Sequence, residues 1–230
     1  MIIRLLISLI ALQTVQASQA RIIGGNVARS GRWPFIVSLN QYIPGLKKYR
    51  HHCGGSILNR YQILTAAHCF DKNSNPLDWV ALVGKNNIKS PIHKPKISRL
   101  TRKKAKKMSH VFIPQDILIH EKYQSKGWVN DIAIINLKNP LPLNRNTMKK
   151  IALARKKPVK SDQCYVGGWG SLHRNGTRYP EKLREAEVPI RDFRLCRKNY
   201  IAAGSRNVKP GQNFCAGNGL RDSCSVRNIQ

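Results

Sequence analysis

The chain has 230 residues, which is enough for one medium-sized domain or for two small subdomains that share a core. Hydrophobic residues make up 41% of it, which favours a folded globular protein. Lys and Arg number 41 against 11 Asp and Glu, and the formal net charge of +30 is more than solubility requires. This charge indicates an anionic partner but does not identify its chemistry.

Residues 1–20 have the features of a signal peptide. Arg4 precedes an apolar run over residues 5–12, and small residues follow at Ala17, Ser18 and Ala20. Cleavage after Ala17 and cleavage after Ala20 both fit the pattern. The run is far shorter than the ~20 apolar residues of a membrane span, and no later segment comes closer. We therefore expect secretion or storage in a secretory vesicle, and no membrane span.

A basic residue, a β-branched pair and two glycines follow directly, as Arg21-Ile22-Ile23-Gly24-Gly25. Two interpretations stay open from these residues alone. The segment is an ordinary turn, or it is a processing site at which cleavage after Arg21 frees Ile22 as a new N-terminus.

Short strands separated by Gly, Asn and Pro recur along the chain and predict an all-β barrel or sandwich. The predicted strands are residues 33–39, 55–58, 61–65, 80–83, 116–120 and 132–137. One short helix is expected near residues 192–200. Residues 149–160 contain six basic residues and little patterning, which is typical of a surface linker between subdomains.

Six cysteines are present without any C-x-x-C pair, at positions 53, 69, 164, 196, 215 and 224. In an oxidising compartment such cysteines form disulfides more often than metal sites. We expect no metal site and no cofactor.

Two residues are candidates for catalytic chemistry. His68 follows an apolar run and precedes Cys69, a pattern that by itself is more typical of a core histidine or a disulfide neighbour. Asp131 stands at the start of the apolar strand 132–137 and needs partners if it is buried. A histidine N–H is one such partner, and the backbone amides of a turn are the alternative. The order His then Asp matches one known triad arrangement.

Together these residues resemble the trypsin-like serine endopeptidases of the chymotrypsin fold. The resemblance implies two six-stranded antiparallel β-barrels, with residues 22–148 in the first, a basic linker over 149–162 and an incomplete second barrel over 163–230. Within the family, residues 78–79, 119–123 and 183–186 are most similar to the acrosins. The motifs that carry the resemblance are residues 21–25, 33–34, 53–56, 65–69, 130–133, 168–170, 214–217 and 222–224.

The resemblance also implies roles. His68 would be the general base, Asp131 its orienting carboxylate, and Asp222 the floor of a pocket for Arg or Lys side chains of protein substrates. Cleavage of the zymogen after Arg21 would free the Ile22 amine for an internal ion pair. The implied disulfides are Cys53–Cys69 and Cys196–Cys215, whereas Cys164 and Cys224 lack their usual partners.

The chain departs from the family after Cys224. The family continues there with Gln-Gly-Asp-Ser-Gly-Gly-Pro, whereas this chain has Ser225-Val226-Arg227-Asn228-Ile229-Gln230. Asn228 stands at the position of the nucleophile, and an amide cannot be activated by a base to attack a carbonyl. Arg227 stands at the position of the ion-pair carboxylate, and Ser225 lies three positions too early to replace the nucleophile. We therefore expect a catalytically disabled chain, from a splice form, a frameshift or an incomplete gene model.

The densest charge lies over residues 94–107, where eight of fourteen residues are basic and none is acidic. Such a segment binds polyanions through counterion release, and both secretion and the acrosin-like character favour sulfated glycans over nucleic acid. Asn175-Gly176-Thr177 is a glycosylation sequon. The eight basic residues are Lys94, Lys96, Arg99, Arg102, Lys103, Lys104, Lys106 and Lys107.

Overall fold

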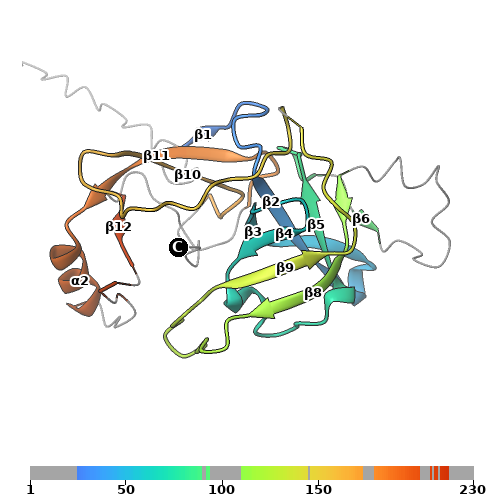
Figure 1. Ribbon diagram of the computed structural model, residues 1–230, viewed down its shortest axis with the longest axis horizontal. Coiled ribbons are helices and arrows are strands. Elements are labelled where there is room, and N and C mark those ends of the chain that lie inside the picture. The colour runs from blue at the N-terminus through green and yellow to red at the C-terminus, as the bar shows by residue number, and fades with distance from the viewer. Residues whose placement is uncertain are drawn as a thin grey trace, which may run out of the picture.

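The computed structural model describes residues 25–89, 92–93, 110–144, 146–172, 179–202, 208, 210–211 and 213–217. These residues form two antiparallel β-sheets and, within the described ranges, a single α-helix (Figure 1). The predicted all-β class is confirmed. None of the described helices is long and apolar enough to cross a membrane.

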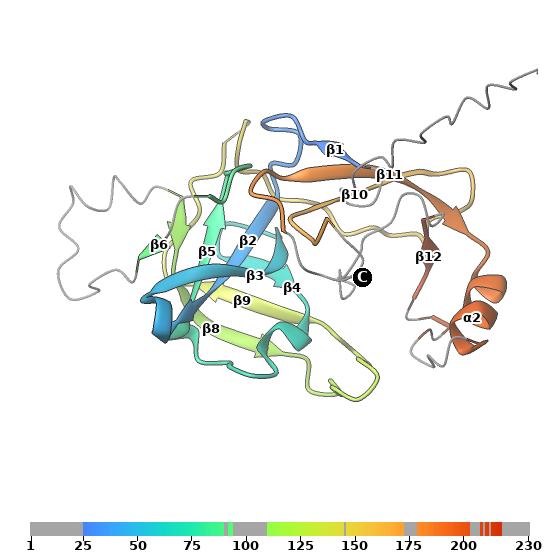
Figure 2. The ribbon, with the colours of Figure 1, turned by 180° about the vertical axis from the view of Figure 1, so that it is seen from behind.

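The larger sheet has eight strands and is built by the first half of the chain. Its strands are β2 (Ile36–Ile43), β3 (Lys48–Ile57), β4 (Gln62–Thr65), β5 (Trp79–Val83), β6 (Ile92–His93), β7 (Val111–Phe112), β8 (Pro114–Ile119) and β9 (Ala133–Leu137). They are ordered β7-β5-β2-β3-β4-β9-β8, and β6 pairs with β3. Both views show this sheet curling around its own interior (Figures 1 and 2).

The smaller sheet has four described strands, β1 (Asn26–Val27), β10 (Gln163–Gly168), β11 (Arg184–Arg191) and β12 (Cys215–Ala216). β11 pairs with all three others. The α-helix α2 (Phe193–Ala202) follows β11, and three short 3-10 helices lie in the first half, η1 (Pro44–Leu46), η2 (Ala67–Phe70) and η3 (Pro76–Asp78). Because β1 belongs to the smaller sheet, a boundary at residue 148 does not fully separate the two sheets.

The core of the larger sheet lies inside its curl. Alternate residues of β9 are buried, and all five residues of β5 are buried between the strands on either side. Leu39, Ile57, Ile63, Trp79 and Ile135 are each at most 1% exposed. A second, smaller cluster of Ala28, Trp169 and Leu183 lies where the two sheets meet.

Most predicted strands coincide with observed ones, and the differences have physical reasons. β2 begins at Ile36 because residues 33–35 form a turn. β3 extends seven residues before the predicted start at 55, since its polar first half pairs with β2 from Lys48↔Ile43 onwards. The linker over residues 149–162 contains no described strand or helix, and it begins along the larger sheet, where Ile151 N–H donates to the Ile57 carbonyl at 2.9 Å.

Asn86 joins the two halves of the chain. Its backbone carbonyl accepts hydrogen bonds from the Leu183 N–H at 2.7 Å and from Trp169 Nε1 at 3.1 Å. Its side-chain Nδ2 donates to the Arg29 carbonyl at 3.0 Å. This single residue, in the loop that follows β5, therefore binds the N-terminal segment, the residue that follows β10 and the residue that precedes β11.

Two glycines are required by close approaches. A Cβ on Gly167 of β10 would lie 2.9 Å from ring atoms of Trp33, whose Nε1 donates to the Glu185 carboxylate. A Cβ on Gly55 of β3 would lie 2.8 Å from the Ile63 side chain and 3.0 Å from the Leu64 carbonyl. Because these glycines lack a Cβ, the β4 residues can pack directly against the backbone of β3, and the Trp33 ring can pack directly against the backbone of β10.

Candidate active site

η2 places His68 at one end of the larger sheet. β4 ends at Thr65, whose Oγ1 donates to the Gly54 carbonyl at 2.8 Å. Ala66 and Ala67 are fully buried, so only small side chains fit between the sheet and the turn. The Cys53–Cys69 disulfide then ties η2 to β3. His68 is therefore held by covalent and packing contacts on both sides, and it is 8% exposed.

Asp131 contacts His68 twice. Its Oδ1 accepts the backbone N–H of His68 at 2.8 Å, and its Oδ2 lies 2.6 Å from His68 Nδ1. Both side chains are nearly buried, at 6% and 11% exposure. The structure thus brings together the two residues that sequence reasoning selected as base and orienting carboxylate.

These contacts fix the tautomer of His68. A carboxylate only accepts hydrogen bonds, so the 2.6 Å contact places a proton on Nδ1. The lone pair of a neutral imidazole is then on Nε2, the nitrogen that faces away from Asp131. His68 is consequently arranged to accept a proton at Nε2.

The loop between β8 and β9 that carries Asp131 has an unusual backbone. Gly127, Trp128 and Asn130 have φ angles of +91°, +49° and +53°. Positive φ is unfavourable for a bulky residue such as tryptophan. The loop is braced by Asn130 Nδ2, which donates to the Lys122 carbonyl at 2.8 Å. This conformation directs the Trp128 ring to 5.9 Å from the His68 ring, and Trp128 is 39% exposed.

Trp128 is a site residue that sequence reasoning missed. Its ring lies beside the imidazole, so a molecule that approaches His68 from that side meets an indole ring. The sequence Gly127-Trp128 shows only a turn; the contact depends on how the loop folds back.

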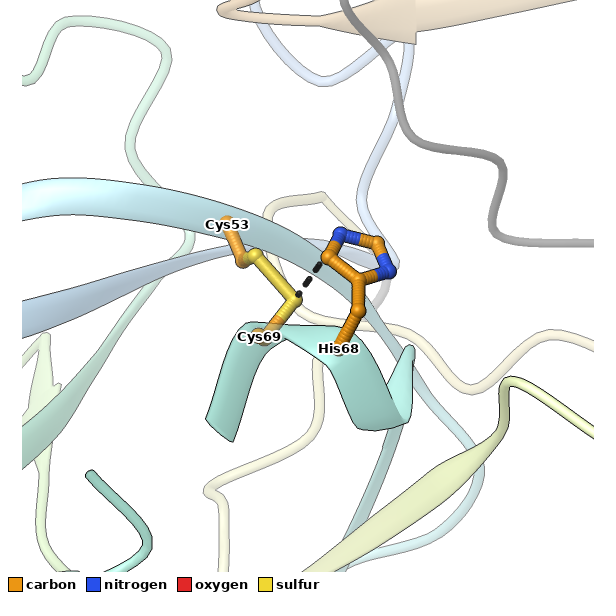
Figure 3. Close-up of side chains that lie close together, drawn as sticks. All are labelled: Cys53, His68 and Cys69. Atoms are coloured by element: carbon orange, nitrogen blue, oxygen red, sulfur yellow. Dashed lines mark hydrogen bonds between the residues drawn. A yellow bond between two sulfur atoms is a disulfide. The ribbon is translucent and has the colours of Figure 1, made fainter. Parts of the chain in front are cut away.

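Cys53, His68 and Cys69 place three potential metal ligands within 4.8 Å (Figure 3). The two sulfurs are bonded to each other, so neither is a thiolate. Cys69 Sγ lies 3.9 Å from His68 Nε2, which is a packing contact for an Nε2 that carries no proton. In this oxidised form the disulfide packs against the imidazole, and the three residues do not constitute a metal centre.

A second polar cluster, in which Ser38 and Asn40 are buried and His51 is partly buried, lies on β2 and β3. Buried Asn40 donates to Ser38 Oγ at 3.0 Å, and Ser38 Oγ lies 2.8 Å from His51 Nδ1. The His51 ring packs 5.6 Å from Trp169. Burial lowers the pKa of His51 to about 4, and the charge of neighbouring His52 adds to this shift. His51 is thus neutral near pH 7, and its Nδ1 shares a hydrogen bond with the Ser38 hydroxyl.

The described cysteines form the disulfides Cys53–Cys69 and Cys196–Cys215, the pairings that the resemblance implies. Cys164, half-buried on β10, has a free thiol in the part of the chain that the structure describes. Several predicted site residues lie outside the described residues. These are Arg21, Ile22, Asp222, Cys224, Ser225, Arg227, Asn228, Asn175 and the eight basic residues of 94–107.

Comparison with known proteins gives one consistent family. The sequence model described as Trypsin matches residues 22–225. Human transmembrane protease serine 11B is 31% identical over 208 residues, which are 89% of this chain and 43% of that protein. Mouse transmembrane protease serine 11C is 31% identical over 209 residues, covering 89% and 42%. The chain therefore spans less than half the length of these relatives.

Solved structures agree with the fold. The crystal structure of a scabies mite inactivated protease paralogue, S-D1, matches with a TM-score of 0.68 and 25% identity, covering 87% of this chain and 79% of that one. The structure of GrC matches with a TM-score of 0.65 and 22% identity over 85% and 75%. The predicted fold of two β-barrels is confirmed.

Replacement of Asp131 tests the tautomer. In Asp131→Asn the amide oxygen still accepts the fixed backbone N–H of His68, so the amide NH₂ faces Nδ1. We expect the imidazole proton to move to Nε2, because the ring can change tautomer and the backbone cannot. Long-range ¹H–¹⁵N spectra of histidine-labelled protein in alkaline buffer measure this directly. Asp71→Asn, which alters a contact with Tyr123 at 2.9 Å, is the control and should leave the His68 tautomer unchanged.

The lowered pKa of His51 predicts a pH-dependent stability. An unfolded histidine binds a proton below its ordinary pKa of 6.5, whereas folded His51 does so only below about 4. The stabilisation is complete above pH 6.5 and is lost as the pH falls towards 4, by up to about 3 kcal/mol. Urea unfolding at both ends of this window should show a smaller loss in His51→Gln than in the parent. An equal reduction in the exposed control His120→Gln would contradict this assignment.

Proposed function

Because the chain belongs to the trypsin family of serine proteases, we propose that His68 and Asp131 are the base and the orienting carboxylate of an endopeptidase site. The observation that carries this is a pair of contacts made by the Asp131 carboxylate. One oxygen lies 2.8 Å from the backbone nitrogen of His68, and the other lies 2.6 Å from its Nδ1. Asp222 would provide the negative charge that selects Arg or Lys side chains in protein substrates. No cofactor is required by this chemistry.

The geometry supports proton transfer at Nε2. A base in this position takes the proton of an attacking hydroxyl, and the carboxylate of Asp131 stabilises the imidazolium that forms. The Trp128 ring lies beside the imidazole, with the two ring centroids 5.9 Å apart. His68 is held so firmly that little reorganisation accompanies the transfer.

We further propose that this chain does not complete the reaction. Asn228 occupies the position of the nucleophile four residues after Cys224, and its amide has no proton that His68 can remove. Arg227 occupies the position of the carboxylate that would pair with the Ile22 amine, and two positive groups repel each other. The similarity to a scabies mite protease paralogue named as inactivated supports this proposal.

The remaining assignments follow the family. We propose a signal peptide over residues 1–20, followed by secretion and by activation through cleavage after Arg21. We also propose that the sequon at Asn175 is a glycosylation site. Storage in an acrosome-like granule and similarity to the acrosins remain predictions. The linker over residues 149–162 would join the first barrel at 22–148 to the partial second barrel at 163–230.

A direct assay tests the proposed loss of catalysis. The purified chain, processed so that it begins at Ile22, is incubated with an arginyl amide substrate and with a fluorophosphonate probe that labels activated serines. We expect no turnover and no labelling, because no hydroxyl stands at the nucleophile position. Trypsin is the positive control.

Hydrolysis that His68→Ala abolishes would overturn the proposed inactivity and would leave the dyad assignment intact. Hydrolysis unaffected by His68→Ala would show a contaminating protease. The assay would then be repeated with a preparation free of that protease. Labelling of Ser225, located by mass spectrometry, would identify an unexpected nucleophile.

A second candidate function is binding of sulfated polyanions, favoured by the net charge of +30 and the eight basic residues of 94–107. The linker adds exposed cations that the structure describes, among them Lys149, Lys150 and Lys156. Such binding does not require catalysis, so it is compatible with a disabled site. Each neutralised anionic group releases counterions and makes the affinity salt-dependent.

Heparin affinity at several salt concentrations tests this function. We expect the combined change of Arg102, Lys103, Lys104 and Lys106 to Gln to reduce the logarithmic salt slope by about 3. The control changes Lys72, Lys85, Lys126 and Lys138 to Gln, exposed residues that remove the same charge. Equal effects of the two sets would show that only net charge matters and would exclude a specific site at 94–107.

A further inference from the structure

A hollow of about 740 Å³ lies between α2, the end of β11, β12 and residues 158–160 of the linker. We call it the α2 groove. Ile190 and Cys215 form its buried floor, and Val159, Leu195 and Tyr200 line its sides. His68 does not line it, and the helix α2 stands at the far end of the smaller sheet from the larger sheet (Figures 1 and 2).

α2 presents apolar side chains to this groove without burying them. None of its ten residues is buried, and Leu195 and Tyr200 are 61% and 50% exposed. The helix is held instead by the Cys196–Cys215 disulfide and by Asp192, whose Oδ1 accepts the Leu195 N–H at 2.8 Å. A helix of this length is marginal by itself, so the disulfide and the cap keep an apolar surface in place.

The groove is also cationic. Lys160 and Arg191 line it and are exposed, and the outward face of α2 adds Arg194, Arg197 and Lys198. Among the described residues the structure records no ion pair to any of these five. Two carboxylates lie nearby: Asp162 Oδ2 accepts the Val159 N–H at 2.8 Å, and Asp192, which also lines the groove, caps α2. The five basic residues outnumber these two carboxylates, so the groove combines apolar walls with an excess of positive charge.

We propose that the α2 groove binds an acidic peptide segment of a partner protein, with one apolar side chain seated between Leu195, Val159 and Tyr200. Carboxylates on either side of that anchor would reach Lys160 and Arg191. The charge of the whole chain would speed the encounter with an acidic partner. A second copy of this chain is unsuitable, because two chains of +30 repel each other.

The apolar walls distinguish a peptide from other anionic partners. Sulfated glycans carry charges and hydroxyls but have no side chain that would fill an apolar hollow. A membrane surface is flat and accepts protruding apolar residues, whereas these residues line a concavity. An acidic peptide with an apolar anchor satisfies both the charge and the shape.

The probe is a pool of fluorescein-labelled acidic heptapeptides of Asp and Glu with one variable apolar residue at the centre. Fluorescence polarisation with the full chain should show saturable binding. We expect at least a tenfold loss with Lys160→Glu plus Arg191→Glu, and a similar loss with Leu195→Ser. The matched control, Lys72→Glu plus Lys138→Glu in loops of the first half of the chain, removes the same charge and should retain most of the affinity.

All substituted residues are exposed, so the variants should keep the parent's circular dichroism spectrum and melting temperature. No saturable binding, or equal losses in the two double variants, would overturn the proposal. Heparin octasaccharide binding that depends on Lys160 and Arg191 but not on Leu195 would reassign the groove to glycans. Binding to phosphatidylserine vesicles that depends on Leu195, without peptide binding, would reassign it to a membrane surface.

Discussion

The contact between Asp131 and His68 is the interaction on which the site depends. It is set by strand register, because Thr65 at the end of β4 pairs with Ala133 at the start of β9. Residues just beyond the one and just before the other must therefore meet, although they lie 63 positions apart in sequence. A carboxylate so nearly buried needs full hydrogen bonding, and His68 supplies two donors. Strand pairing thus brings the two residues together, and His68 supplies the hydrogen bonds that the nearly buried Asp131 carboxylate needs.

The sequence predicts the fold well where an apolar run marks a strand of the larger sheet. β4, β5 and β9 lie within one residue of their predicted ends because their apolar runs end at polar or turn residues. The polar first half of β3 and the two-residue strand β1 were not predicted. Each is defined by the strand opposite it, and Asn26 pairs with Glu185, which is far away in sequence. Pairing of this kind leaves no local periodicity to detect.

The candidate site divides in the same way. His68 and Asp131 stand in motifs whose residue types have a chemical meaning, so both could be selected from the sequence. Trp128 and His51 could not. The position of Trp128 depends on three positive φ angles in one loop, and the neutral state of His51 depends on burial beside Ser38. Motifs identify the atoms that react, whereas loop conformation and burial determine what surrounds them.

The junction at Asn86 has a consequence for how the molecule opens. One carbonyl that accepts from both Leu183 and Trp169 cannot release one partner without disturbing the other, and the same residue holds Arg29. Opening at this junction would therefore disturb both sheets together. We expect the Leu183 amide, which donates at this junction, to exchange its hydrogen slowly with solvent.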